Sequence, residues 1–170
     1  MKLENLKNCI ESELKEIYVL NQSLTPMLGA LKDIKHLKRL INMSNCSKGL
    51  KIRGKIAAFM ICFREDSEYE SKNYLYFNRK YKEFLYVDRI GVSKNLENNG
   101  LGSILYKDVI ENFGEDLKIC AEINIRPMNE KSIIFHEKHD FKKVLEKCYN
   151  ENYKVVFMER NASSSKKKYK

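Results

Sequence analysis

The residues most informative about chemistry lie in the segment YVDRIGVSKNLENNGLGS, residues 86–103. A strand followed by a turn with Gly100 and Gly102, and then by a helix, can form an anion site. Glycines let backbone N–H groups approach a phosphate, and the helix N-terminus adds partial positive charge. Asn98 and Asn99 tolerate the left-handed backbone that such a turn needs. Without a P-loop lysine or a third glycine, the pattern alone is equally typical of an ordinary strand-to-helix turn.

The elements before this turn are predicted from the spacing of apolar residues. Helical spacing predicts a helix around residues 10–18, a break near Thr25-Pro26, and a second helix that begins at the N-cap Asp33. Short apolar runs then indicate two strands that reverse direction at Gly54.

The elements after Gly54 alternate between strands and helices. The segment 67–84 is predicted to be a long loop rich in tyrosine and phenylalanine, and strand 84–92 follows it. The remaining predicted elements are a helix from 101 to 113, a strand over 117–125, a short helix over 129–139, and a hairpin around Asn150-Asn152. This order predicts a single α/β domain over residues 1–160, with a mixed sheet.

Composition excludes several classes of protein. Five scattered cysteines and three histidines show no disulfide or metal-ligand spacing. The charged first twenty residues do not resemble a signal peptide, and the longest apolar run, 56–63, is too short to cross a membrane. We therefore expect a cytoplasmic protein with reduced thiols, no metal and no membrane segment.

The net charge of +9 is concentrated partly at the C-terminus, where residues 161–170 hold four lysines and no acid. This segment is predicted to be a disordered basic tail. A basic surface can attract nucleic acid, acidic membranes or an anionic cofactor, and it can also serve solubility alone. No GxxG loop or paired strand aromatics occur, so nucleic acid is disfavoured as a partner.

Two segments together resemble the GNAT superfamily of N-acetyltransferases. The turn at 97–102 resembles motif A, Gln/Arg-x-x-Gly-x-Gly/Ala after a strand, and INIRPMNEKSIIFHEKHDF at 123–141 resembles motif B. The likeness covers about residues 1–160 in element order and is closest to a group of predicted bacterial-type GNAT proteins. It implies a mostly antiparallel sheet of six to seven strands, splayed in the middle, with about four helices. It also implies acetyl transfer from acetyl-CoA to an amine.

The resemblance also implies where the cofactor binds. The strand over 85–92 would splay from the strand over 118–125, and the pantetheine arm would pair with the backbone of Ile90 and Val92. Asn129 would bind the same arm while starting the last helix. The pyrophosphate would lie on the backbone N–H groups of Asn98, Asn99, Gly100, Leu101, Gly102 and Ser103.

Catalysis in this family needs a base that takes a proton from the acceptor amine. Asp88 is the first candidate, because strand alternation places it on one face with Tyr86 and Ile90, near the splay. Glu122 and Asn124 on the neighbouring strand are the alternatives. Asp88 could instead serve an ion pair or a hydrogen bond to the aromatic loop.

His136 matches the position of a family tyrosine that protonates the departing thiolate, and an imidazole can donate such a proton. A structural role in packing the last helix is equally compatible with a single histidine. Two positions depart from the family pattern. Glu97 stands where Gln or Arg is usual, and Asp140 replaces the glycine before Phe141, at a site where aspartate can adopt the left-handed conformation.

The acceptor amine is the part of the function that remains open. The aromatic segment is expected to cover an acceptor pocket that suits a small or aromatic amine or a peptide end. Two alternatives stay open, a CoA-binding module without efficient catalysis and a basic ribosome- or RNA-associated protein. Both a monomer and a homodimer are compatible with the sequence. The residues expected to contact the acceptor are Tyr74, Tyr76, Phe77, Tyr86 and Asn124.

Overall fold

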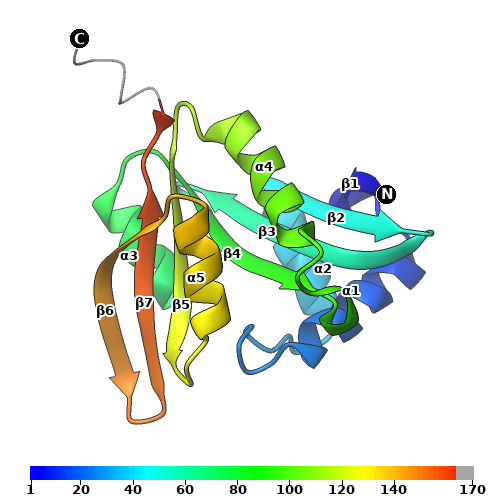
Figure 1. The fold of residues 1–170 in the computed structure, drawn as a ribbon, viewed down its shortest axis with the longest axis horizontal. Coiled ribbons are helices and arrows are strands. Elements are labelled where there is room, and N and C mark those ends of the chain that lie inside the picture. Colours follow the sequence, from blue (N-terminus) through cyan, green and yellow to red (C-terminus); the bar gives the residue numbers. More distant parts are fainter. Residues whose placement is uncertain (164–170) are drawn as a thin grey trace.

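The computed structural model describes residues 1–163, which fold around one seven-stranded sheet (Figure 1). The strand order is β1-β2-β3-β4-β5-β7-β6, and every neighbouring pair is antiparallel except β4 and β5. The sheet is therefore mixed and mostly antiparallel, as the sequence predicts. The strands are β1 (Lys2–Asn5), β2 (Cys46–Ile52), β3 (Lys55–Arg64), β4 (Phe84–Val92), β5 (Lys118–Arg126), β6 (Lys142–Asn150) and β7 (Tyr153–Arg160).

Helices cover both faces of the sheet and divide the core into two clusters. One buried cluster joins the sheet to α1 (Glu11–Ser23), α2 (Ile34–Met43) and α3 (Lys72–Lys80). The other joins it to α4 (Leu101–Phe113) and α5 (Glu130–Lys138). Figure 1 shows α4 and α5 in front of the sheet, with the other three helices behind it.

Several local predictions are confirmed at the level of single residues. Asp33 caps α2, where its side chain accepts a 2.7 Å hydrogen bond from the His36 amide. The reversal between β2 and β3 has Arg53 and Gly54 at φ of 51° and 79°. Asp140 has φ of 66°, so it adopts the left-handed conformation in place of the family glycine. These features are local, which is why the sequence alone indicates them.

The prediction of a long loop over 67–84 is wrong, because α3 occupies residues 72–80. Tyr74 and Phe77 lie three residues apart on its inner face and are fully buried. The helix has no side-chain cap at Ser71 and is rich in aromatic residues, which are poor helix formers. Its formation depends on burying these rings against the sheet.

The two halves of the sheet separate between β4 and β5. These parallel strands pair only from Phe84 to Val87 and from Lys118 to Ala121. Beyond those residues β4 stays paired with β3, and β5 with β7, so the two strands diverge as a wedge (Figure 1). The splayed sheet implied by the resemblance to the GNAT superfamily is present.

A register shift at Asp88 changes which side chains share a face of β4. Cys62 pairs with Val87 and the next residue, Ile61, pairs with Arg89, so Asp88 is an additional residue in β4. Such a bulge reverses the alternation of side chains beyond it. Tyr86 packs in the cluster with α1–α3, whereas Ile90 packs against the cluster with α4 and α5. The prediction that both share one face with Asp88 is wrong.

The first three residues of the expected tail lie against the domain. The Ser163 amide donates a 2.9 Å hydrogen bond to the carbonyl of Gly114, at the end of α4. The rest of the expected tail, residues 164–170, lies outside the described part of the chain. Within residues 1–163, none of the helices is both long and apolar enough to cross a membrane.

Candidate active site

The N-terminus of α4 presents free backbone amides. Gly100 caps the helix with φ of 76°, Asn98 has φ of 63°, and no side chain caps the first turn. Among residues 1–163, none of the backbone N–H groups from Asn98 to Ser103 has a hydrogen-bond partner. These amides and the helix dipole form a site suited to an anion.

Two neighbours of this turn explain its sequence. A Cβ atom at Gly102 would lie 2.9 Å from Cζ of Phe135, so any larger residue there would force this ring to move. The Glu97 carboxylate lies 3.1 Å from the ammonium of Lys131. This ion pair directs the unusual acid of the turn toward α5 and offsets its charge.

The backbone of β4 beyond the bulge is available inside the wedge. The Ser93 amide donates a 2.9 Å hydrogen bond to the carbonyl of Ala57 in β3. Backbone groups of an antiparallel strand alternate in direction, so those of Ile90 and Val92 point away from β3. Within the described part of the chain, the side of β4 that carries them has no strand partner past Val87.

Asn129 lies at the start of α5, next to the wedge. Its side-chain oxygen accepts a 3.3 Å hydrogen bond from the Ser132 amide, so it is the N-cap that the sequence predicts. Its own amide donates to the carbonyl of Asn124 at 3.0 Å and ties α5 to β5. The side-chain nitrogen of Asn129 has no partner among the described residues.

Two carboxylates lie at the apex of the wedge, since Asp88 and Glu122 are the first residues of their strands beyond the last β4–β5 pair. Glu122 accepts hydrogen bonds from the hydroxyl of Tyr86 and, at 3.2 Å, from the side-chain amide of Asn73. Burial raises the pKa of Glu122 to about 8, and the nearby charge of Asp88 adds to this effect. The donors that hold Glu122 are neutral, and none is a cation.

Asn73 connects Glu122 to the β6–β7 hairpin. The hydroxyl of Tyr149 donates to its side-chain oxygen at 2.6 Å, and its nitrogen lies 3.2 Å from the hydroxyl of Tyr153. Asn73 is 6% exposed, so this network is internal. No local pattern in the sequence indicates these contacts, because Asn73 is 49 residues from Glu122 and 76 residues from Tyr149.

Asp88 has different partners from Glu122. One of its oxygens accepts a 2.6 Å hydrogen bond from the hydroxyl of Tyr69, and the other lies 3.0 Å from Nε of Arg89. Burial raises the pKa of Asp88, although the charge of Arg89 and the hydrogen bond from Tyr69 oppose the shift. Arg89 also donates to Asn21 at 2.8 Å and to the carbonyl of Gly29 at 2.6 Å. Asp88 is thus connected through Arg89 to the loop between α1 and α2.

His136 lies in the core between α4 and α5 and is 2% exposed. Its Nδ1 donates to the carbonyl of Ser132 at 2.7 Å, so its Nε2 accepts the hydroxyl of Tyr106 at 2.8 Å. Burial lowers the pKa of His136 to about 4. The ring is therefore neutral at physiological pH, and both nitrogens are engaged.

The five residues expected to contact an acceptor lie in different environments. Tyr74 and Phe77 are fully buried in the core, and Tyr76 is half-buried and stacks on Phe157 with ring centroids 4.4 Å apart. Tyr86 is buried and donates to Glu122. The side chain of Asn124 donates a 3.0 Å hydrogen bond to the carbonyl of Pro26, in the loop between α1 and α2. Tyr86 and Asn124 are therefore the two that border the wedge.

This geometry combines an open helix start, a wedge with free backbone groups and a weakly acidic carboxyl group at its apex. Among residues 1–163, histidine, cysteine, aspartate and glutamate side chains form no group of three or more suited to a metal ion. The sequence profile of the Acetyltransferase (GNAT) family matches residues 13–141. The chain belongs to the GNAT acetyltransferase family.

Solved structures of similar fold support this assignment. The ribosomal-protein-S18-alanine N-acetyltransferase of Escherichia coli aligns with a TM-score of 0.66 at 14% identity, covering 94% of this chain and 92% of that one. Arabidopsis thaliana Naa50, in complex with the bisubstrate analogue CoA-Ac-MVNAL, aligns with 0.68 at 17% identity, covering 94% and 97%. At these identities the likeness shows the GNAT fold. No curated protein sequence matches this chain.

Membership of the GNAT family confirms the resemblance drawn from the two motifs. Motif A corresponds to the open start of α4, and motif B to the end of β5 with α5. The family carries out acetyl transfer that depends on acyl-CoA.

Proposed function

We propose that this GNAT protein is a cytoplasmic N-acetyltransferase that transfers an acetyl group from acetyl-CoA to a primary amine of a peptide or small molecule. The observation that carries the proposal is the position of Glu122, a carboxyl group with a raised pKa, at the apex of a wedge beside an open helix start. The CoA–peptide analogue bound by Naa50 is consistent with this use of the fold. All five cysteines are free, as in proteins of reducing compartments.

The residues around the wedge fit acetyl-CoA. Backbone amides from Asn98 to Ser103 would hold the pyrophosphate, and each charge-assisted hydrogen bond contributes about 1.5–3 kcal/mol. The free side-chain nitrogen of Asn129 and the backbone of Ile90 and Val92 would hold the pantetheine arm. When bound, acetyl-CoA supplies the acetyl group as an activated thioester.

Glu122 is assigned as the general base. An amine reaches the site as an ammonium ion, and the Glu122 carboxylate takes the proton that this ion must lose, directly or through water. A carboxyl group with a pKa of about 8 is a much stronger base than an ordinary glutamate. Tyr86 and Asn73 hold the carboxylate in place through neutral hydrogen bonds.

Asp88 and His136 are assigned positioning roles. Asp88 neutralises Arg89, which holds the α1–α2 loop through Asn21 and the carbonyl of Gly29. Nε2 of His136 accepts a hydrogen bond from the hydroxyl of Tyr106, and its one ring N–H donates to a backbone carbonyl. A neutral ring with this arrangement is a poor proton donor for a thiolate.

Two measurements test the function. Calorimetry with acetyl-CoA should show saturable binding, and thiol release should be detected with at least one amine from a panel of amino acids, polyamines and peptides. Binding of acetyl-CoA without thiol release from any amine would instead support a CoA-binding module. Absence of acetyl-CoA binding would contradict both the acetyltransferase and the CoA-binding module.

A further inference from the structure

A groove of about 560 Å³ lies between α3 and the β6–β7 hairpin, on the face of the sheet opposite α4 and α5. In Figure 1, α3 lies behind β6 and β7, and β6 is the edge strand of the sheet. Leu145 of β6 is 43% exposed, so the groove has an open apolar rim. Its lining residues are Lys72, Leu75, Tyr76, Arg79, Lys80, Leu145, Lys147, Tyr149 and Phe157.

The groove is lined by four cations and no acid. Lys80 has a carboxylate partner, Glu159 at 2.9 Å. Lys72, Arg79 and Lys147 have no ion pair with any described residue. Like charges gathered around an aromatic floor repel one another, and an anionic occupant relieves this repulsion. The charge of the groove therefore favours an acidic ligand.

One end of the groove is connected to the apex of the wedge. Tyr149 lines the groove and donates a 2.6 Å hydrogen bond to Asn73, which donates in turn to Glu122 at 3.2 Å. The side chain of Tyr149, at this end of the groove, is thus two hydrogen bonds from the proposed base. From Tyr149 the groove continues along β6 to Lys147 and Leu145.

The aromatic rings of the groove favour a polypeptide over a nucleic acid. Tyr76 is stacked on Phe157, and the Lys80 ammonium lies over the Tyr76 ring, 5.5 Å from its centroid. Tyr149 is likewise stacked on Tyr153, at 5.2 Å, and the ammonium of Lys72 lies 6.0 Å from its ring centroid. Binding of single-stranded nucleic acid relies on free ring faces for its bases. These covered rings do not offer them.

We propose that the groove binds an acidic segment of a polypeptide acceptor whose amine reaches Glu122. The inference rests on the proposed function and names its substrate class. Aspartate or glutamate side chains of the acceptor would pair with Lys72, Arg79 and Lys147, while its aliphatic groups contact Leu75 and Leu145. Exposed ion pairs are individually weak, so several acidic residues are needed for a clear preference.

Direct binding tests the inference without requiring turnover. Three peptide series share a mixture of first residues and a C-terminal fluorophore. They differ in a downstream segment of acidic residues, glutamines or lysines. The fluorescence anisotropy of each series is measured with the protein in the presence of CoA. We expect the acidic series to bind at least tenfold more tightly than the glutamine series at low salt. The preference should shrink at 0.5 M salt, because screening weakens exposed ion pairs.

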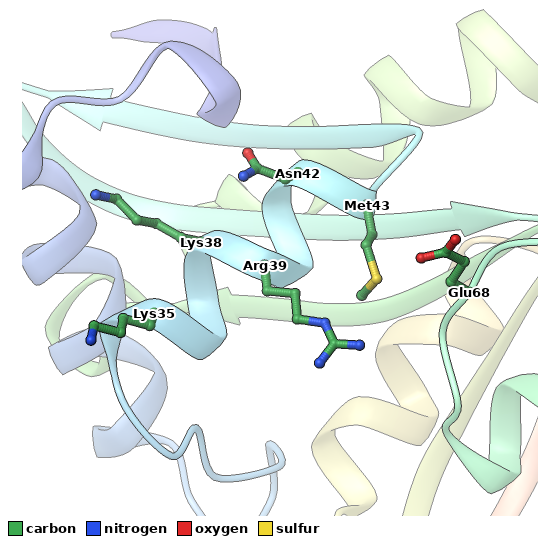
Figure 2. A pocket seen from close by; sticks show the side chains of 6 residues that line it. All are labelled: Lys35, Lys38, Arg39, Asn42, Met43 and Glu68. Carbon is green, nitrogen blue, oxygen red and sulfur yellow. The ribbon is translucent and has the colours of Figure 1, made fainter.

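A matched pair of triple variants locates the effect. Lys72→Gln, Arg79→Gln and Lys147→Gln together should abolish the acidic preference and leave the affinity for acetyl-CoA unchanged. The control substitutes Lys35, Lys38 and Arg39 by glutamine, which removes the same charges from a separate hollow on α2 (Figure 2). All three control residues are exposed, and the control should bind acidic peptides as the unaltered protein does.

Equal binding of the three peptide series would overturn the inference. An equal loss of the acidic preference in the control variant would overturn it as well. A single-stranded RNA oligonucleotide that displaces the acidic peptide through Lys72, Arg79 and Lys147, and binds more tightly, would also overturn it. The proposed function is tested separately. If peptides bind through the groove but no amine releases thiol, acetyl transfer is contradicted, while the binding of an acidic ligand in the groove is still supported.

Discussion

At the scale of single residues, Glu122 and Asp88 differ in their partners although both begin the splay. Glu122 is held by the neutral donors Tyr86 and Asn73, whereas Asp88 faces the guanidinium of Arg89. Neutral donors leave a buried carboxyl group with a raised pKa and therefore with useful basicity. A carboxylate that is paired with an arginine, as Asp88 is, serves instead as a structural counter-charge.

The substitution Glu122→Gln removes this basicity and preserves the size of the side chain. We expect kcat to fall by about 10²–10⁴-fold with little change in the affinity for acetyl-CoA. The acidic limb of the kcat/KM profile, expected near pH 8, should disappear. Tyr86→Phe is the companion variant. It removes a hydrogen bond that lowers the pKa of Glu122, so the limb should move to higher pH and persist.

Asp88→Asn should behave as the loss of a positioning residue. Arg89 would lose its counter-charge in a buried site, at a cost of about 3 kcal/mol, so the melting temperature should fall. KM for the acceptor should rise, because the α1–α2 loop is less firmly held, and the acidic limb should remain. A variant with unchanged melting temperature and no acidic limb would make Asp88 the base.

At the scale of elements, the start of α4 is a candidate anion site because its local sequence leaves amides free. Gly100 and Asn98 adopt left-handed conformations, and no side chain of residues 1–163 caps the first turn with a hydrogen bond. The packing of Gly102 against Phe135 limits mutational tests at that glycine. Isosteric changes of charge at the exposed asparagines avoid this difficulty.

Asn98→Asp combined with Asn99→Asp places two negative charges beside the proposed pyrophosphate site. CoA should bind about tenfold more weakly, a loss of about 1.4 kcal/mol. The melting temperature should stay constant or rise slightly, because acids near a helix N-terminus are stabilising. Asn112→Asp, at the other end of α4, adds one such charge away from the site as a control and should leave the affinity unaltered. Equal affinities in calorimetry would contradict the site.

At the scale of the whole molecule, the ionisation of Glu122 is coupled to folding. Its pKa is about 8 in the folded protein and near 4.5 in an unfolded chain, so the folded state retains the proton. The stability that this group contributes is complete below about pH 4.5 and is lost as the pH rises through 8. Glutamine does not ionise and carries no such dependence.

The melting temperature of Glu122→Gln should therefore exceed that of the unaltered protein by more at pH 8.5 than at pH 5. Differential scanning calorimetry across this range measures the difference, and no acceptor is needed. A difference that stays constant from pH 5 to 8.5 would show that the pKa of Glu122 is not raised.

The sequence by itself determined the features that depend on neighbouring residues. The cap of α2 at Asp33, the reversal at Gly54, the glycine turn before α4 and the cap of α5 at Asn129 each follow from contacts within a few positions. Backbone turns and helix starts are encoded locally. Two such segments resembled GNAT motifs, and that resemblance, not the residues themselves, implied the splayed sheet.

Only the tertiary structure decided which carboxyl group lies among neutral donors and which faces arginine. The bulge at Asp88 arises from pairing with β3, so strand alternation in the sequence could not indicate it. Asn73 and Tyr149 reach Glu122 from α3 and the β6–β7 hairpin, and His136 is neutral because α4 and α5 bury it. A pKa depends on burial and on charges brought together by folding, and these properties belong to the packed molecule.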